Sequence, residues 1–261
     1  MIIASYLIAG IFAGLVAGLL GVGGGIIVVP ILILCFESQG FSSQILTHMA
    51  IGTSLATIVF TSASSIIHHH RMGSVLWPVF RPMALGIAFG AILGVLTVVQ
   101  LDGLILKKLV GFFAIIVALR MWFKTAIKGT HRLPDRSVLV AVGVFVGWVS
   151  SMFGIGGGTV TVPYLNRCRL EMKQVVGTAA ACGFPIAVLG SVTNAVVGMG
   201  VDGRPDWSVG FIYLPALLSV VMTSMYFAKV GARWANRMPS DMLRHIFAAL
   251  LLVVGIRFLA V

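Results

Sequence analysis

Residues 18–30 read GLLGVGGGIIVVP, and a closely similar stretch, SMFGIGGGTVTVP, returns at residues 151–163. The two stretches share four glycines, a proline and a following leucine at a constant offset of 133 residues. The matched positions are Gly21, Gly23, Gly24, Gly25, Pro30 and Leu32 in the first copy and Gly154, Gly156, Gly157, Gly158, Pro163 and Leu165 in the second. This match indicates that the chain is built from two copies of one unit.

The repeat continues beyond the glycine motif, at offsets that change where connecting segments differ in length. Gly52-Thr53 recurs as Gly177-Thr178 at an offset of 125 residues, and Pro78, Gly94 and Arg120 recur as Pro215, Gly231 and Arg257 at an offset of 137. We therefore expect a first transmembrane repeat at residues 1–124, a basic cytoplasmic linker at 125–136 and a second transmembrane repeat at 137–261.

Composition predicts a polytopic membrane protein. Hydrophobic residues make up 59% of the chain and charged residues 10%, and the mean hydropathy is +1.08. So much apolar surface is typical of chains that cross a bilayer several times. The net charge of +11 comes from Lys and Arg in connecting segments, which indicates cytoplasmic loops facing anionic lipid rather than nucleic-acid binding.

Apolar segments can be marked along both halves, and most have the length of about 20 residues that spans a bilayer as a helix. They lie at residues 1–36, 44–67, 75–100 and 104–124, and then at 137–166, 174–200, 208–230 and 240–261. The first segment would measure roughly 54 Å as one helix, nearly twice the hydrocarbon core. Because glycine clusters and prolines disfavour a regular helix, we expect the first segment of each repeat to break at its glycine motif.

The two short helices on either side of each break could cross the membrane together, or the second could turn back as a hairpin. The distribution of the 18 Lys and Arg residues distinguishes these two arrangements. A crossing would place nine of them on each side. A hairpin would place fourteen on one side and leave four on the other, namely Lys107, Lys108, Arg204 and Arg257. The uneven split favours hairpins, and hence an all-α fold of two four-segment repeats in inverted orientation.

Broken helices near the bilayer midplane predict a binding site, since freed backbone groups are tolerated there only when buried or facing a polar cavity. The amides at a helix start carry partial positive charge and suit an anion. We therefore place the substrate at Gly23, Gly24, Gly25, Gly156, Gly157 and Gly158. The alternative interpretation is that these glycines only let helices pack closely.

Polar side chains nearby are candidate donors to the substrate: Thr53, Thr159, Thr178 and Asn194, with His48 as a weaker candidate for a gate. All seven carboxylates map to loops or segment ends, which argues against a carboxylate-driven pump or a cation substrate. The three cysteines have no metal-type spacing, so we expect neither a metal site nor a cofactor.

The paired glycine motifs, with Gly52-Thr53 and Gly177-Thr178 after them, resemble the sulfite exporter TauE/SafE family of bacterial and archaeal membrane permeases. The resemblance covers essentially the whole chain. Members are associated with small sulfur anions such as sulfite, sulfoacetate and sulfonates. The resemblance implies a permease of the plasma membrane for a small anion, with the glycine motifs at the translocation site.

The functional expectation is thus an anion transporter and not an enzyme, because no hydrolase or metalloprotease motif and no pair of intramembrane acids is present. We expect export of sulfite or a related organosulfur anion by alternating access between the repeats. Two alternatives stay open: an ion-coupled uptake permease for a sulfonate or thiosulfate, and a scaffold that transports nothing. The expected partners are the anion and membrane lipid, with the oligomeric state undetermined.

Overall fold

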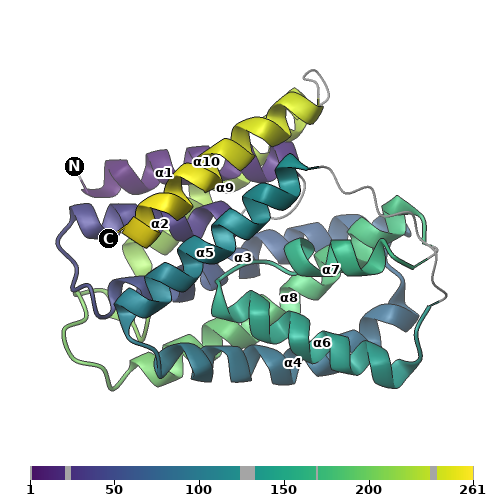
Figure 1. Ribbon diagram of the computed structural model, residues 1–261, viewed down its shortest axis with the longest axis horizontal. Helices are drawn as coiled ribbons and strands as arrows, with labels where there is room; N and C mark the ends of the chain where they lie inside the picture. The colour runs from purple at the N-terminus through teal and green to yellow at the C-terminus, as the bar shows by residue number, and fades with distance from the viewer. Residues whose placement is uncertain (1, 21–24, 124–132, 169, 236–239, 261) are drawn as a thin grey trace.

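The computed structural model describes residues 2–20, 25–123, 133–168, 170–235 and 240–260. Within these ranges the chain forms ten helices and one two-stranded ribbon, which confirms the expected all-α class (Figure 1). The first half contains α1 (Ile2–Leu20), α2 (Gly25–Ser38), α3 (Leu46–Arg71), α4 (Trp77–Val99) and α5 (Gly103–Trp122). The second contains α6 (Arg136–Met152), α7 (Gly158–Leu165), α8 (Met172–Gly198), β1 (Ser208–Val209), β2 (Ile212–Tyr213), α9 (Leu214–Ala235) and α10 (Ser240–Ala260).

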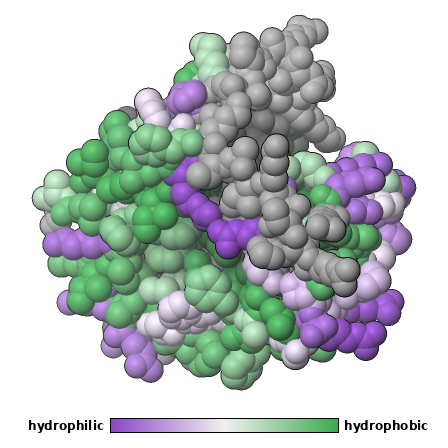
Figure 2. All heavy atoms as spheres, turned by 45° about the vertical axis from the view of Figure 1, so that its right-hand side comes forward, coloured by the Kyte–Doolittle hydropathy of each residue, from purple (hydrophilic) through white to green (hydrophobic). Residues whose placement is uncertain are grey.

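Three of the described helices, α3, α4 and α8, are long and apolar enough to cross a membrane. Shorter apolar helices accompany them, including α2 and α6. Much of the outer surface is also apolar: on α4, Leu85 is 72% exposed and Phe89 60%. Figure 2 shows broad hydrophobic areas over the face in view, with hydrophilic residues at its margins and in a narrow run near its centre. Such a surface belongs in lipid rather than in water.

The first apolar segment is two helices that turn back on each other, separated by residues 21–24, which lie outside the described ranges. Tyr6, near the start of α1, donates a 2.5 Å hydrogen bond to Oε1 of Gln39, just after α2, and its ring contacts that of Phe36. The start of α1 therefore lies beside the end of α2. Most of the expected linker, residues 124–132, also lies outside the described ranges.

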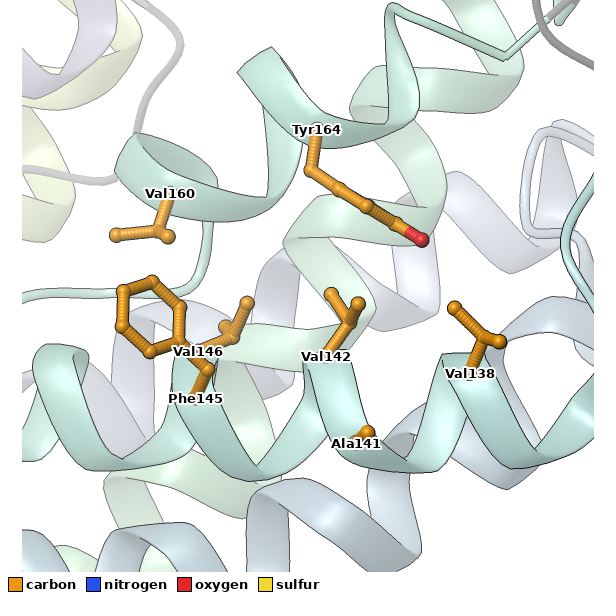
Figure 3. A pocket seen from close by; sticks show the side chains of 7 residues that line it. All are labelled: Val138, Ala141, Val142, Phe145, Val146, Val160 and Tyr164. Carbon is orange, nitrogen blue, oxygen red and sulfur yellow. The ribbon is translucent and has the colours of Figure 1, made fainter.

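The corresponding segment of the second half breaks at the predicted place. Helix α6 ends at Met152, α7 begins at Gly158, and the loop between them contains Gly154 with a φ of +63°. Tyr164 at the end of α7 and Val138 at the start of α6 line the same groove, so this pair is a hairpin too (Figure 3). The two hairpins open at opposite ends of the molecule (Figure 1).

Helices α3 and α8 pack against each other in the middle of the molecule. Around them, α1 packs against α9, α4 against α6, and α5 against α10. Each outer pair thus joins a helix from one half to a helix from the other. In Figure 1, α4 and α6 run together along the lower edge, while α1, α9 and α10 gather at the upper edge.

Glycine allows two of these pairs to approach backbone to backbone. A Cβ atom on Gly14 of α1 would lie 2.6 Å from the carbonyl oxygen of Ser224 in α9. A Cβ atom on Gly147 of α6 would lie 2.5 Å from the carbonyl oxygen of Ile87 in α4. Any larger residue would force the helices apart, as in other small-residue helix contacts within membranes.

Candidate functional site at the glycine crossing

The two glycine motifs meet inside the molecule. Gly25 is the first residue of α2, and a Cβ atom on it would lie 3.1 Å from the carbonyl oxygen of Gly154 and 3.1 Å from the amide nitrogen of Gly156. The start of α2 therefore rests against the loop that precedes α7. We call this contact, formed by Gly25 and residues 154–158, the glycine crossing. The other two residues expected in the first motif, Gly23 and Gly24, lie outside the described ranges.

Helix α3 holds one side of the glycine crossing. The Ser54 hydroxyl donates a 2.8 Å hydrogen bond to the carbonyl oxygen of Gly154, and both residues are buried. A Cβ atom on Gly154 would lie 2.7 Å from Cγ2 of Val29 and 3.1 Å from Cα of Ile51. Both the positive φ and the lack of space require glycine at this position.

Helix α8 holds the other side. A Cβ atom on Gly157 would lie 2.9 Å from the amide nitrogen of Gly183 and 3.1 Å from the carbonyl oxygen of Ala179. Gly156 has more room, since the nearest atom to its Cβ position, Cγ2 of Ile58, is 3.9 Å away. The loop thus runs between the two central helices, with Gly158 opening α7 directly after it.

The electrostatic character of the crossing follows from its two helix starts. The first amides of a helix have no partner within it, and they carry the positive end of the helix dipole. Helices α2 and α7 bring two such starts to one buried place. The carboxylates whose side chains are described, in contrast, lie at helix ends or in loops: Glu37, Asp102, Asp135, Glu171, Asp202 and Asp206.

Three buried hydroxyl oxygens flank the loop without a hydrogen-bond partner: those of Ser150, Thr159 and Thr161. Ser150 and Thr161 are fully buried. Buried hydroxyls ordinarily find a partner, so each of these three is available to bond a ligand or ordered water. Sequence reasoning found Thr159 but missed Ser150 and Thr161, although their places on either side of the glycine motif were a usable signal.

Thr53 and Thr178 form hydrogen bonds with residues that are distant in the sequence and lie outside the loop. Oγ1 of Thr53 accepts a 3.0 Å hydrogen bond from the amide of Tyr213, the residue before α9. Oγ1 of Thr178 accepts a 3.0 Å hydrogen bond from the amide of Leu76, the residue before α4. Each central helix therefore holds the start of an outer helix of the other half.

Asn194 and His48 each contact Phe211, a residue outside the loop. The carbonyl oxygen of Asn194 accepts a hydrogen bond from the Phe211 amide, and the His48 ring stacks on the Phe211 ring at 5.3 Å. The Asn194 side chain donates to Gly190 within α8, while its Oδ1 is buried without a partner. Nε2 of His48 lies 3.1 Å from the carbonyl oxygen of Val98.

Comparison with known proteins tests the resemblance noted from the motifs. The family model described as sulfite exporter TauE/SafE matches residues 6–258. The chain belongs to the TauE/SafE family. A probable membrane transporter protein of Haemophilus influenzae is 34% identical over 253 residues, covering 96% of this chain and 95% of its own. One from Methanocaldococcus jannaschii is 28% identical, over 96% and 92% of the two chains.

This TauE/SafE membership confirms the resemblance and agrees with a membrane transporter rather than an enzyme. A further relative, the probable membrane transporter protein YunE of Bacillus subtilis, is 26% identical over 95% of this chain and 94% of its own. No solved structure matches this TauE/SafE chain. Among the described residues, no group of three or more His, Cys, Asp and Glu side chains could hold a metal ion.

Proposed function

We propose that this protein is a plasma-membrane permease that exports sulfite or a related organosulfur anion by alternating access at the glycine crossing. The observation that carries the proposal is the contact between Gly25 and the Gly154–Gly156 loop, which brings two helix starts together in a buried place. A fully deprotonated oxyanion accepts hydrogen bonds and donates none, so amides and hydroxyls are the groups that would bind it. Gly25, Gly156, Gly157, Gly158 and Thr159 form the proposed site, joined by Ser150 and Thr161.

Inverted repeats are the architecture that we propose for this transport, and reciprocal contacts support them. Gly14 packs on Ser224 as Gly147 packs on Ile87, and these positions correspond at offsets of 133 and 137. The bonds from Tyr213 to Thr53 and from Leu76 to Thr178 correspond in the same way. Units that exchange equivalent contacts can rock against each other around a fixed site.

Thr53, Thr178, Asn194 and His48 take a second role in this proposal. The two threonines fasten each repeat to the outer helix of the other, so they guide the rocking motion. Asn194 and His48 form a gate at Phe211, beyond the crossing. The unpaired Oδ1 of Asn194 accepts a hydrogen bond when the gate moves.

Export follows from charge. The membrane potential assists an anion leaving a negative-inside cell by about 2.3 kcal/mol per charge at 100 mV. No carboxylate lies at the described part of the crossing, so this permease needs no proton relay there. In the proposed orientation, the end of the molecule with most of the described Lys and Arg residues faces the cytoplasm, and the 125–136 linker is cytoplasmic.

The test is efflux of labelled sulfite from proteoliposomes with a potassium diffusion potential. We expect efflux to follow the potential, to need no proton or sodium gradient, and to fall at least tenfold in Ser150→Ala and Thr159→Val, since a hydrogen bond to a charged group contributes about 1.5–3 kcal/mol. Neither hydroxyl has a protein partner, so thermal stability should not fall. A Gly200→Ala variant is the control, because nothing lies within 4 Å of its Cβ position.

Unchanged efflux in both hydroxyl variants would show that the substrate does not bind at the glycine crossing. Flux that requires a proton or sodium gradient and runs inward with a sulfonate or thiosulfate would favour the uptake permease. A protein that neither moves nor is stabilised by any of these anions would be a scaffold.

A further inference from the structure

The second hairpin contains an apolar groove. The groove lies between α6 and α7 and has a volume of about 400 Å³, within the range of pockets that hold small organic ligands (Figure 3). Val138, Val142 and Phe145 line it from α6, and Val160 and Tyr164 from α7. In the first hairpin, the buried Tyr6 ring packs on Phe36 between α1 and α2.

The groove opens to the outside of the molecule. Val138 is 45% exposed and Phe145 is 57% exposed, on the side of α6 away from its packing against α4. In a membrane protein such a surface meets lipid or another membrane-embedded chain. An empty apolar groove of this size is unfavourable in a bilayer, because its lining loses dispersion contacts that a fitting occupant restores.

One end of the groove carries polar and basic groups. The phenol hydroxyl of Tyr164 points toward Val138 at this end (Figure 3). Arg136 is the first residue of α6, two positions before Val138, and Arg167 follows Tyr164 in a turn closed by a 3.1 Å hydrogen bond between their backbones. Both arginine side chains belong to exposed residues. The groove thus has a hydroxyl at one end and two exposed arginines within three chain positions of its lining residues, a combination that matches an acyl chain joined to a phosphate.

We infer that this groove binds an anionic phospholipid of the surrounding bilayer, with one acyl chain between α6 and α7 and the phosphate at Arg136 and Arg167. A second copy of the chain is a poorer occupant. Two copies in one membrane have the same orientation, so each would bring its own Arg136 and Arg167 to the same depth, where like charges repel. An anionic lipid brings the opposite charge to that depth.

The lipid also has a mechanical consequence. Helix α7 is only eight residues long and starts at the glycine crossing. An acyl chain wedged between α6 and α7 supports the face of α7 that the protein leaves uncovered. Occupancy of the groove therefore stabilises the hairpin without touching the proposed transport site.

The test uses delipidated full-length protein in detergent, with native mass spectrometry and thermal unfolding as readouts. The probes are dioleoylphosphatidylglycerol, dioleoylphosphatidylcholine of the same chain length, and glycerol phosphate without chains. We expect one tightly retained phosphatidylglycerol, preferred over phosphatidylcholine by about tenfold or more, and no effect of glycerol phosphate.

Two variants separate the parts of the site. Arg136→Gln with Arg167→Gln should abolish the preference for the anionic lipid, and Val142→Trp, which fills the groove, should abolish retention of either lipid. Leu85→Trp is the control, because it adds the same ring to an exposed position on α4. Equal retention of both lipids by the native protein, stabilisation by glycerol phosphate alone, or a cross-linked dimer that Val142→Trp disrupts would each overturn the inference. If Val142→Trp does not fold, the arginine variant alone still decides it.

Discussion

The hydroxyl of Ser54 and the carbonyl oxygen of Gly154 are joined by a 2.8 Å hydrogen bond across 100 positions of the chain. This bond fastens the broken hairpin of the second half to the central helix of the first. It satisfies a carbonyl group that the break removed from helical pairing, which is a condition for irregular backbone inside a membrane. The bond therefore belongs to the support of the glycine crossing rather than to its binding surface.

Ser54→Ala should lower the free energy of unfolding by about 1–3 kcal/mol, because it leaves the buried Gly154 carbonyl without its donor. Thermal or denaturant unfolding in detergent measures the loss. Ser38→Ala is the matched control: its hydroxyl donates to the Cys35 carbonyl in an exposed position, and the change should stay within about 0.5 kcal/mol. Equal effects of the two substitutions would contradict the assigned role of Ser54.

Gly154→Ala should destabilise the protein more than Gly73→Ala. Both glycines have a φ of +63°, so both substitutions carry the backbone strain of about 1–2 kcal/mol. Only at Gly154 would the new Cβ atom also meet Val29 and Ile51, whereas nothing lies within 4 Å of the Gly73 position. The difference in unfolding midpoint isolates the steric term, about 1–3 kcal/mol. No difference would mean that the loop moves freely away from α2 and α3.

Thr53→Val and Thr178→Val should have similar costs, about 1–3 kcal/mol each, because each removes the acceptor of one part-buried amide. The contacts are separate, so the double variant should show the sum within about 0.5 kcal/mol. Thr→Ser at either position keeps the oxygen and serves as the control. Unfolding measurements in which Ser is as harmful as Val would assign the effect to the lost methyl group instead of the hydrogen bond.

Lys107→Met should cost about 1.5–3 kcal/mol, since it removes a charge-assisted bond to Glu37 in a largely buried place and leaves that carboxylate with Arg257, whose Nη2 lies 3.9 Å from Oε2. Nζ of Lys107 lies 2.6 Å from Oε1 of Glu37, and Lys107 is only 6% exposed. Adding Glu37→Gln to Lys107→Met should recover part of the stability. A double variant that is less stable than Lys107→Met alone would contradict this account of the ion pair.

Cysteine labelling tests the proposed orientation. A membrane-impermeant maleimide added to intact cells should label Ser42→Cys and Asp202→Cys, and should label Met72→Cys only after the cells are opened. All three positions are exposed, and Met72 lies at the opposite end of α3 from Ser42. The native protein is the control for labelling of its own cysteines. Burial raises the pKa of the Cys168 thiol, so this residue holds less reactive thiolate at neutral pH. The reverse pattern would place the basic end outside.

The break in the second hairpin was predictable from sequence because it depends on local preferences. Three consecutive glycines and a following proline disfavour a continuous helix wherever they occur, and α6 does end before Gly154. The roles of individual hydroxyls were not predictable in this way. Thr53 and Thr178 were expected to face the substrate, yet each binds an amide more than 100 positions away in the chain.

The sequence by itself determined that this is a membrane protein of the TauE/SafE type, since composition and the paired glycine motifs are properties of the chain alone. It also determined which positions of the two halves correspond. Only the tertiary structure decided which of these positions touch: Gly25 with Gly154, Ser54 with the loop, and Thr53 with Tyr213. The physical reason is that a helix presents several faces, and which face meets another segment depends on packing of the whole molecule rather than on local sequence.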